Sequence, residues 1–578
     1  MKAVSFIPMM LMASSLCAAD FTLVSPDGRV VAGISKDMSY SVSVGSSEIL
    51  DGTAAIHPSG SRGGFSLSAP KKRSVADMVA SPFYRNDSIF ETYNELTFKA
   101  AKDWKLQFRA YNDGVAYRWI YTGRKPVEVV NEVADFDFAG NPRCFVPFVR
   151  TDNINDFESQ FFNSFENVYT ESPLDQLDSR RLAFLPLYVE SADSVKVVVT
   201  ESDVRSYPGL FLNRSEGSKL SGVFAPVPDE LERGGYLGIQ KLVKSRHPYI
   251  AELDGPRSLP WRVVMIGQND AAIAENQLSY LLAEPSRVTD TSWIKPGKVA
   301  WDWWNDWNIT GVDFKSGVNN DTYKHYIDFA ADNDIEYIIM DDGWSVKSSD
   351  NLFSIIPEID LKELIDYGRQ KNVGIILWAG YLPFEKDLEE VCRHYSAMGV
   401  KGFKVDFLDR NDQIMQDFEQ RAAEACARHG LLLDLHGTHM PGGMNRTWPN
   451  VLNFEGVNGL ENLKWSSATL DLLKYDVTIP FTRQVAGPMD YTQGAMRNAT
   501  KAKYHPSNSE PVSQGTRAHQ VGLYMVFDSP LSMMCDSPSA YRHEQPTTDY
   551  ITSIPTVWDE TRVLAGKIGE YILSLIHI

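Results

Sequence analysis

Residues 402–407 read GFKVDF, a short run of mostly apolar residues that ends in a carboxylate at Asp406. Aromatic and β-branched residues in a run of this length are typical of a buried strand. A later segment, NFEGVNGLE at residues 453–461, begins in a similar way and adds the carboxylates of Glu455 and Glu461. If such runs alternate with helices, the strands are parallel and their carboxyl ends lie at the same edge of the sheet. The fold of this half of the chain therefore depends on that alternation.

Eight apolar runs follow one another from residue 298, and segments with helical periodicity separate most of them. Strands that alternate with helices form a parallel sheet. Eight such units in about 270 residues are the size of a (β/α)8 or TIM barrel. A doubly wound open sheet is the alternative, but no glycine-rich phosphate loop follows the first run. The predicted strands are 298–301, 337–340, 374–378, 402–405, 431–435, 451–454, 476–480 and 523–527.

The ends of these predicted strands are rich in acidic and aromatic residues. In a TIM barrel, the side chains that carry the chemistry lie at the carboxyl ends of the strands. Two carboxyl groups placed there are what cleavage of a glycosidic bond requires, one as nucleophile or base and one as acid. The sequence therefore favours a hydrolase that acts on sugars. The strand-end residues are Asp302, Trp303, Trp304, Asp341, Asp342, Trp344, Trp378, Asp406, His436, Glu455 and Glu461.

The first half of the chain shows short alternating runs separated by turns. Residues 104–111 and 115–121 alternate between apolar and polar side chains on either side of the turn sequence NDG, which predicts a β-hairpin. Many short strands without a long helix predict a β-sandwich. Apolar residues between 270 and 285 recur at helical spacing, so we expect one helix there that connects the sandwich to the barrel.

The first 19 residues combine Lys2, an apolar stretch and the small residues Cys17-Ala18-Ala19. This order is typical of a secretory signal peptide that is cleaved near Ala19. We therefore expect export by the Sec route to the periplasm or the extracellular space, and a lipid anchor on Cys17 is the alternative. No other apolar run approaches the ~20 residues that span a bilayer. The other cysteines show no spacing typical of a metal site or a disulfide framework.

The overall charge argues against some classes of partner. The chain has 578 residues, a formal net charge of −19 and a pI near 5.1. An acidic protein has no electrostatic basis for binding nucleic acid or an anionic membrane. A neutral substrate such as a sugar is compatible with this charge. The 13 Trp residues offer rings that can stack on sugars or fill a core.

Taken together, five segments resemble glycoside hydrolase family 97: WDWWNDW (301–307), YIIMDDGW (337–344), GFKVDF (402–407), DLHGTHMPGG (434–443) and NFEGVNGLEN (453–462). The resemblance extends over nearly the whole chain. It implies an N-terminal β-sandwich at residues 20–285, after a signal peptide at 1–19, and a catalytic (β/α)8 barrel at 286–572. The smaller C-terminal β-domain of the family is expected to be truncated, with residues 573–578 as its remnant.

Two positions distinguish the mechanistic branches of this family. The inverting α-glucosidase branch lacks a carboxylate at the end of the fourth strand and has a glutamate base after the fifth-strand histidine. This sequence has Asp406 at the first position and Gly437, directly after His436, at the second. The resemblance therefore implies a retaining, exo-acting α-galactosidase. The alternatives are a β-L-arabinopyranosidase, an α-glucosidase and, outside the enzyme class, a carbohydrate-binding protein without activity.

A retaining mechanism needs a nucleophile and an acid/base whose carboxyl groups are about 5–5.5 Å apart. We expect Asp406 to be the nucleophile and Glu461 the acid/base, with Glu455 as the second candidate for that role. Lys404 lies two residues before Asp406 on the same strand face, where it would bind sugar hydroxyls and keep Asp406 ionised, or only form an ion pair. The other candidate substrate-binding residues are Asp341, Asp342, Trp303, Trp344 and His436.

The resemblance also implies a calcium ion that joins the two domains. Glu455 and Glu461 would bind it from the barrel, and Glu201, in the segment TESDVRSYPGLFL (200–212), would reach it from the sandwich. Carboxylate oxygens are suitable ligands for Ca²⁺. Spacing alone does not predict calcium, because the sequence has no EF-hand loop. The expected partners are an oligosaccharide and calcium, with no nucleic acid and no transmembrane segment; the oligomeric state, monomer included, stays open.

Overall fold

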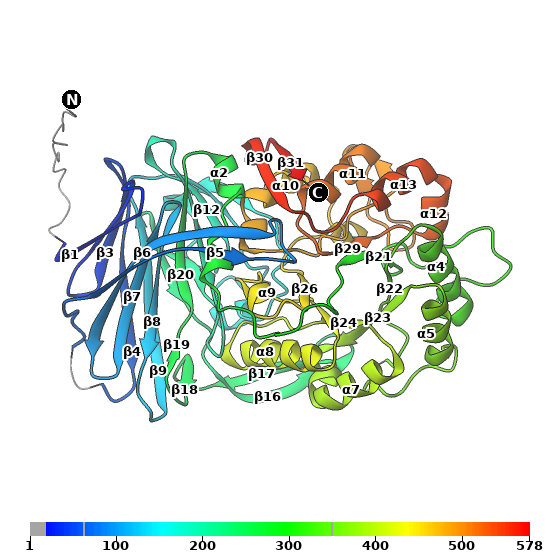
Figure 1. Cartoon of the computed structure of the whole chain (residues 1–578), viewed down its shortest axis with the longest axis horizontal. Coiled ribbons are helices and arrows are strands. Elements are labelled where there is room, and N and C mark those ends of the chain that lie inside the picture. The colour runs from blue at the N-terminus through cyan, green and yellow to red at the C-terminus, as the bar shows by residue number, and fades with distance from the viewer. Residues whose placement is uncertain (1–18, 62–63, 348–350, 578) are drawn as a thin grey trace, which may run out of the picture.

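The structure is a computed structural model that describes residues 19–61, 64–347 and 351–577. An N-terminal all-β part is followed by a parallel barrel with helices outside it, and Figure 1 shows the two parts side by side along the long axis. Within the described ranges, no helix has the length and apolarity needed to cross a bilayer. The predicted combination of a β-sandwich and a TIM-type barrel is confirmed.

Two antiparallel sheets form the N-terminal part, and buried side chains of their strands form a common core. The predicted hairpin is present, because β7 and β8 pair from Trp104↔Tyr121 to Tyr111↔Gly114. The first sheet contains β1 (Phe21–Val24), β2 (Val30–Ile34), β3 (Ser39–Val44), β4 (Ser47–Pro58), β9 (Val127–Phe138), β15 (Lys219–Val223), β14 (Phe211–Glu216) and β18 (Ala251–Leu253). The second contains β11 (Thr170–Pro173), β10 (Arg143–Val146), β12 (Leu187–Glu190), β13 (Lys196–Ser202), β20 (Trp261–Gly267), β8 (Gly114–Tyr121), β7 (Trp104–Tyr111), β6 (Ser88–Ala101), β5 (Lys71–Ala80) and β19 (Arg257–Ser258).

A two-stranded arm extends from the sandwich to the barrel. It consists of β16 (Pro228–Gly234) and β17 (Gln240–Arg246), and Figure 1 shows it below α8, reaching toward α7. The arm is attached to α6 (Tyr381–Lys386), because Leu382 N donates to Ile239 O at 2.9 Å and Lys241 Nζ pairs with Glu385 at 2.5 Å. The sandwich can therefore supply side chains to the mouth of the barrel.

The predicted connecting helix over 270–285 is present as two helices, α2 (Asp270–Ala274) and α3 (Leu278–Leu282). The single-helix prediction is wrong because Asn276 and Gln277 interrupt the helical hydrogen bonds. The Asn276 side chain accepts from Leu278 N at 3.0 Å and donates to Asp113 O at 2.9 Å. Polar side chains that bond to nearby backbone compete with helix in this way.

Seven parallel strands form the barrel in the described part of the chain, in the order β26-β25-β24-β23-β22-β21-β29. The first six predicted strands are confirmed, and helices α4, α5, α7 and α8 lie outside them in Figure 1. The strands are β21 (Gly297–Trp301), β22 (Tyr337–Met340), β23 (Gly374–Gly380), β24 (Gly402–Asp406), β25 (Leu432–Leu435), β26 (Val451–Phe454) and β29 (Leu531–Met534). The helices of the first six units are α4 (Asn320–Asp332), α5 (Leu361–Gln370), α6, α7 (Leu388–Met398), α8 (Gln413–Arg428) and α9 (Met444–Thr447).

The seventh and eighth predicted strands are wrong. Residues 476–480 run from the last residue of α10 (Leu472–Asp476) into η5 (Ile479–Phe481). Residues 523–527 belong mainly to α11 (Arg517–Val526). The Thr516 side chain caps α11, and the buried positions Gln520, Leu523 and Tyr524 have helical spacing. A short apolar run does not distinguish a buried strand from a helix face, and the strand that pairs with β21 is instead β29.

The barrel is nearly closed, because an irregular segment bridges β26 and β29. Asp490 N donates to Phe454 O at 2.9 Å, and Cys535 N donates to Gln493 O at 3.2 Å. The side chain of Asn453 also donates to Leu531 O at 2.6 Å. The segment from 488 to 493 therefore occupies the position where the seventh strand was expected.

A β-hairpin, β30 (Glu560–Lys567) and β31 (Tyr571–His577), packs against α2 of the N-terminal part. The predicted boundary between residues 572 and 573 falls inside β31. The remaining elements are short: α1 (Phe157–Gln160), η1 (Leu174–Gln176), η2 (Ala192–Ser194), η3 (Tyr236–Gly238), η4 (Leu460–Lys464), η6 (Arg483–Ala486), β27 (Asn498–Ala499), β28 (Ser513–Gln514), α12 (Pro538–His543) and α13 (Gln545–Ser553).

Candidate active site

A cavity of about 320 Å³ lies at the carboxyl ends of the barrel strands. Carboxylates, aromatic rings and a lysine line it, as expected for the catalytic end of a TIM-type barrel. Both domains contribute: Ser164, Glu166 and Tyr236 come from the N-terminal part, and Trp303, Asp341, Asp342, Trp378, Lys404, Asp406, Phe407, Asp409, Gly437, Glu455, Glu461 and Trp465 come from the barrel.

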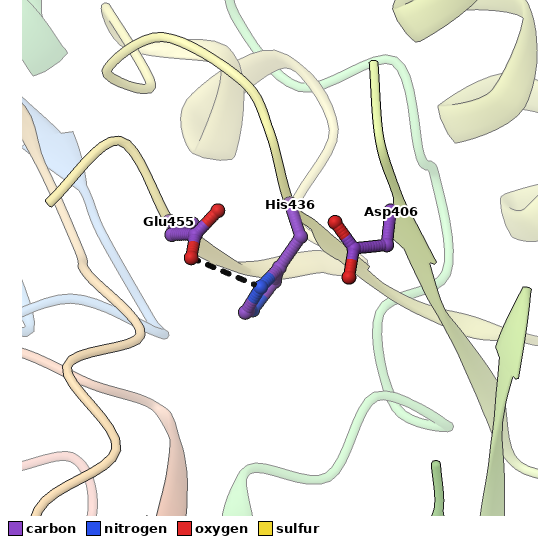
Figure 2. Close-up of side chains that lie close together, drawn as sticks. All are labelled: Asp406, His436 and Glu455. Atoms are coloured by element: carbon purple, nitrogen blue, oxygen red, sulfur yellow. Dashed lines mark ion pairs between the residues drawn. The ribbon is translucent and has the colours of Figure 1, made fainter. Parts of the chain in front are cut away.

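Asp406 ends β24 and faces the cavity. Its Oδ2 accepts a hydrogen bond from Trp378 Nε1 at 3.1 Å, and its Oδ1 accepts one from Phe407 N at 2.6 Å. Figure 2 shows Asp406 and Glu455 on either side of His436. Phe407 has a positive φ of 64°, so the chain turns sharply directly after the carboxylate. The carboxyl group is therefore fixed by two donors and remains accessible to a molecule in the cavity.

Lys404 forms its ion pair with Asp341, whose Oδ2 lies 3.0 Å from Lys404 Nζ. Burial opposes the charge on Lys404, but the surrounding carboxylates, Asp341 above all, raise the pKa of Lys404 well above its ordinary value. Burial also opposes the charge on Asp341, but Lys404 and the indole N–H of Trp301 lower the pKa of Asp341. Both groups are therefore charged, and they line the cavity as predicted.

The other predicted acidic residues near Asp341 differ in accessibility. Asp342 lines the cavity and pairs with Lys347 at 3.3 Å. Asp302 is fully buried and accepts hydrogen bonds from Trp307 and Tyr323, at 3.0 and 2.8 Å. Burial and the charge of Asp341 raise the pKa of Asp302 to about 7. Asp302 therefore supports the site from below and does not face the cavity.

Three carboxylates from both domains converge beside the cavity. Glu166, Glu455 and Glu461 each offer an oxygen within 4.8 Å of the others. Burial and mutual repulsion raise the pKa of Glu166 and of Glu455 to about 7, and they raise the pKa of Glu461 well above its ordinary value. Oxygen donors crowded in this way are suited to a divalent cation, which would offset the repulsion.

Glu201 does not belong to this cluster, and the expectation that it binds the metal is not supported. Its carboxylate pairs with Arg262 at 2.5 Å and accepts from Leu210 N at 2.9 Å, inside the sandwich core. Arg262 also pairs with Glu132 at 2.8 Å. The structure places Glu166 where Glu201 was expected.

Two further predicted residues lie behind the cavity wall. Trp344 is fully buried, and its Nε1 donates to Trp378 O at 2.8 Å, so its ring fills the core and is not placed to bind substrate. His436 Nε2 lies 2.8 Å from Asp490 Oδ2, and its Nδ1 lies 3.4 Å from Glu455. Trp303 does line the cavity. His436 thus contacts Glu455 and Asp490 and is not among the residues that line the cavity.

Gly437 has no room for a side chain. Its φ is +59°, and an added Cβ would lie 2.4 Å from Asp409 Oδ1 and 3.0 Å from Leu408 N. Its own N–H donates to Glu455 at 2.8 Å. A glutamate base at this position is therefore incompatible with the present arrangement of Asp409.

The sequence prediction missed Glu166, Tyr236, Asp409 and Trp465, which all line the cavity. Trp465 follows Glu461 by four residues and lies just beyond the selected segment 453–462, so proximity to Glu461 was the available signal. Asp409 lies three residues after Asp406, in the same loop. Glu166 and Tyr236 lie in the β-rich half, where no strand-end rule applies.

A barrel mouth with several carboxylates and aromatic walls has the groups that a glycoside hydrolase needs. The profile of Glycoside hydrolase 97 matches residues 303–457, and that of Glycosyl-hydrolase 97 N-terminal matches residues 23–285. The chain is 55% identical over 561 residues to a retaining alpha-galactosidase of Bacteroides thetaiotaomicron, with 96% of this chain and 85% of that protein covered. The chain belongs to glycoside hydrolase family 97.

A more distant relative and two solved structures agree with this membership. A probable retaining alpha-galactosidase of Streptomyces bingchenggensis is 28% identical, with 88% of this chain and 72% of that protein covered. A family 97 enzyme from Pseudoalteromonas sp. strain K8, in complex with acarbose, has a TM-score of 0.80 at 21% identity and covers 96% of this chain and 86% of its own. A beta-arabinopyranosidase has a TM-score of 0.81 at 20% identity, covering 97% and 89%. These two structural likenesses concern the fold.

Proposed function

We propose that the protein is a retaining, exo-acting α-galactosidase that hydrolyses terminal α-galactosides. The observation that carries this proposal is Asp406 at the end of β24, opposite a Gly437 that has no room for a glutamate base. The similarity to the retaining alpha-galactosidase of Bacteroides thetaiotaomicron supports the same sugar and the same stereochemistry.

The proposed mechanism is a double displacement. Asp406 attacks the anomeric carbon while Glu461 donates a proton to the departing glycosidic oxygen, which leaves a covalent glycosyl-enzyme. Glu461 then takes a proton from water, the water oxygen bonds to the anomeric carbon, and the bond to Asp406 breaks. Two inversions restore the α-configuration of the sugar. Lys404 and Asp341 form a charged pair on the cavity wall that can bind the sugar hydroxyls.

Glu461 is the better acid/base candidate of the two glutamates. Glu455 is 3% exposed, and it is held by Gly437 N and His436. Glu461 is less buried and also lines the cavity. Glu461 therefore has the access to a departing glycosidic oxygen that a general acid needs.

The cluster of Glu166, Glu455 and Glu461 supports a calcium ion as cofactor. Its donors are carboxylates only, which suits a hard cation, and their raised pKa values reflect burial first and then a mutual repulsion that a cation would offset. When bound, Ca²⁺ would supply positive charge beside the acid/base and attract sugar hydroxyls. We therefore propose that Glu166, and not Glu201, is the calcium ligand from the sandwich.

Export to the periplasm or the extracellular space is also part of the proposal. The predicted signal peptide, except for Ala19, lies outside the described residues. An oligosaccharide is the proposed partner, in agreement with membership of a glycoside hydrolase family.

The direct test is hydrolysis of p-nitrophenyl α-galactoside, followed by ¹H NMR of the first sugar released. We expect α-galactose first, with mutarotation to β-galactose later. Release of β-galactose first would contradict retention. p-Nitrophenyl α-glucoside and β-L-arabinopyranoside serve as matched substrates, and faster turnover of either one would reassign the sugar. Repeating each assay with EDTA, and again after adding Ca²⁺, tests the cofactor.

A further inference from the structure

The cavity mouth carries two aromatic rings that the proposed reaction does not use. Trp465 and Tyr236 line the cavity, yet they are 48% and 46% exposed. Trp378, which donates to the nucleophile Asp406, is only 5% exposed. The two exposed rings therefore lie farther out than the wall around the reacting carbon. Burial of apolar surface gains about 25 cal/mol per Å², so each ring has free energy to gain from a covering ligand.

Trp465 directly follows η4, the element that carries Glu461. Its ring packs edge-on against Trp303, with centroids 5.9 Å apart at 76°. Trp303 is itself held by Lys464, whose Nζ lies 4.1 Å from the ring centroid and donates to Trp303 O at 2.9 Å. Trp465 is thus supported on one side and open on the other.

Tyr236 lies at the tip of the arm from the sandwich. It stacks on Phe407, the residue after the nucleophile, with centroids 4.6 Å apart at 14°. Tyr236 N donates to Gln240 Oε1 at 2.9 Å, and Gln240 Nε2 donates to Asp409 Oδ2 at 2.6 Å. The arm is therefore fixed to the nucleophile loop, and one face of the tyrosine ring is covered while the side chain stays half exposed.

The position of Glu461 indicates which part of a substrate these rings would meet. A general acid must lie next to the glycosidic oxygen, so the leaving group is on the side of η4. The cavity of about 320 Å³ is at the small end of the ~300–1,000 Å³ typical of ligand sites. Both exposed rings line this same cavity, so a sugar linked to the terminal galactose would meet them at its outer end.

We infer that Trp465 and Tyr236 form a leaving-group subsite that stacks on the apolar face of the sugar next to the terminal galactose. This inference rests on the proposed function and specifies its substrates as α-galactosyl oligosaccharides. Because a retaining enzyme passes its glycosyl group to an acceptor on the same side, the subsite also receives sugar acceptors. One ring comes from each domain, so the sandwich takes part in substrate selection.

The test compares melibiose, galactose α-1,6-linked to glucose, with α-galactosyl fluoride, whose leaving group is too small to reach the mouth. Trp465→Ala is expected to lower the ratio of kcat/KM for melibiose to kcat/KM for the fluoride about tenfold, as expected for the loss of an aromatic stack. Tyr236→Ala should lower the ratio less, and Trp465→Tyr should restore most of it. Tyr550→Ala is the control, because Tyr550 is 52% exposed in α13 and does not line the cavity.

A second measurement follows the partition of the glycosyl-enzyme. With α-galactosyl fluoride as donor and glucose as acceptor, Trp465→Ala should lower the ratio of transfer product to hydrolysis product by a similar factor. Unchanged ratios in both alanine variants would overturn the subsite and leave the α-galactosidase proposal intact. Failure of the unaltered protein to cleave either substrate would overturn the proposed function and, with it, this inference.

Discussion

Asp406 is the residue on which the proposed mechanism depends, because its carboxylate is fixed by Trp378 and Phe407 and faces the cavity. Asp406→Gly should lower kcat by at least about 10³-fold. Azide can enter the vacated space and attack the anomeric carbon from the nucleophile's side. We therefore expect partial recovery with azide and a β-galactosyl azide product by NMR. Near-normal activity of the variant without azide would exclude Asp406 as nucleophile.

Glu461 should matter most for substrates whose leaving group needs a proton. Glu461→Gln is expected to lower kcat/KM for melibiose by roughly 10²–10⁴-fold and to affect α-galactosyl fluoride far less, because fluoride leaves without protonation. The same two substrates with Glu455→Gln provide the matched comparison. An equal loss on both substrates in Glu461→Gln would indicate that Glu461 binds substrate or metal and is not the acid.

Asp409 links pH to stability, because burial and the charge of Asp406 raise the pKa of Asp409 to about 8. In the unfolded chain an aspartate ionises near about 3.9, so the stability that wild-type Asp409 contributes is complete below that pH. It falls as the pH rises through about 8. Asp409→Asn resembles the neutral form, since its oxygen can still accept from Gln240. The Tm of the variant minus that of wild type should grow between pH 4 and pH 8.

The control for Asp409→Asn is Asp254→Asn, at a side chain that is 82% exposed. Tm is measured by differential scanning calorimetry across the same pH series. Parallel curves for Asp409→Asn and wild type would show that Asp409 does not titrate in this range.

Among the residues of the candidate site, the sequence predicts those that lie at the ends of barrel strands. Asp406 and Lys404 follow from the two-residue repeat of β24 and face the same cavity. Trp303 and Trp344 look equivalent in sequence, yet Trp303 lines the cavity and Trp344 is buried. Both lie beyond the end of a strand, where the two-residue repeat no longer predicts which way a side chain points. The choice between Glu166 and Glu201 depends on how the sandwich docks, and this has no periodic signal along the chain.

At the scale of elements, the barrel is predictable where β/α alternation is regular. The apolar runs predict β21 to β26, and the helical spacing between them predicts the helices outside. The pattern fails after residue 470, where an irregular segment replaces the seventh strand and α11 presents an apolar face in a run of strand length. The last strand of the barrel is set by the long-range pairing of β21 with β29. Local sequence periodicity does not predict such a pairing.

The arm β16–β17 offers a prediction at the same scale. Gln240 is 3% exposed and connects Tyr236 N, Phe407 O and Asp409. Gln240→Leu leaves these groups without their partner, which costs about 1–3 kcal/mol for a buried polar group. We expect a lower Tm and a raised KM for melibiose. Lys244→Ala, which breaks only an exposed ion pair with Glu232 on the same arm, should change neither. Equal effects of both variants would mean that the arm is not held through Gln240.

At the scale of the whole molecule, the catalytic cavity is shared between two domains. The sandwich contributes Glu166 and Tyr236, while the barrel contributes Asp406 and Glu461. A cation held by Glu166 and the two barrel glutamates would therefore stabilise the folded protein and the domain junction together. Because such a ligand binds the folded state, its effect on stability depends on its concentration.

The calcium proposal predicts different behaviour for two glutamates of the sandwich. Saturating Ca²⁺ should raise the Tm of wild type, with about 2.7 kcal/mol gained at a hundredfold excess over Kd. Glu166→Gln should abolish this Ca²⁺-dependent shift. Glu201→Gln should lower Tm with or without calcium, because it leaves Arg262 with a weakened buried pair, and it should keep the shift. Calorimetry with EDTA and with Ca²⁺ measures both. A shift lost in Glu201→Gln and kept in Glu166→Gln would assign the metal to the position that the sequence suggested and overturn the cluster beside the cavity.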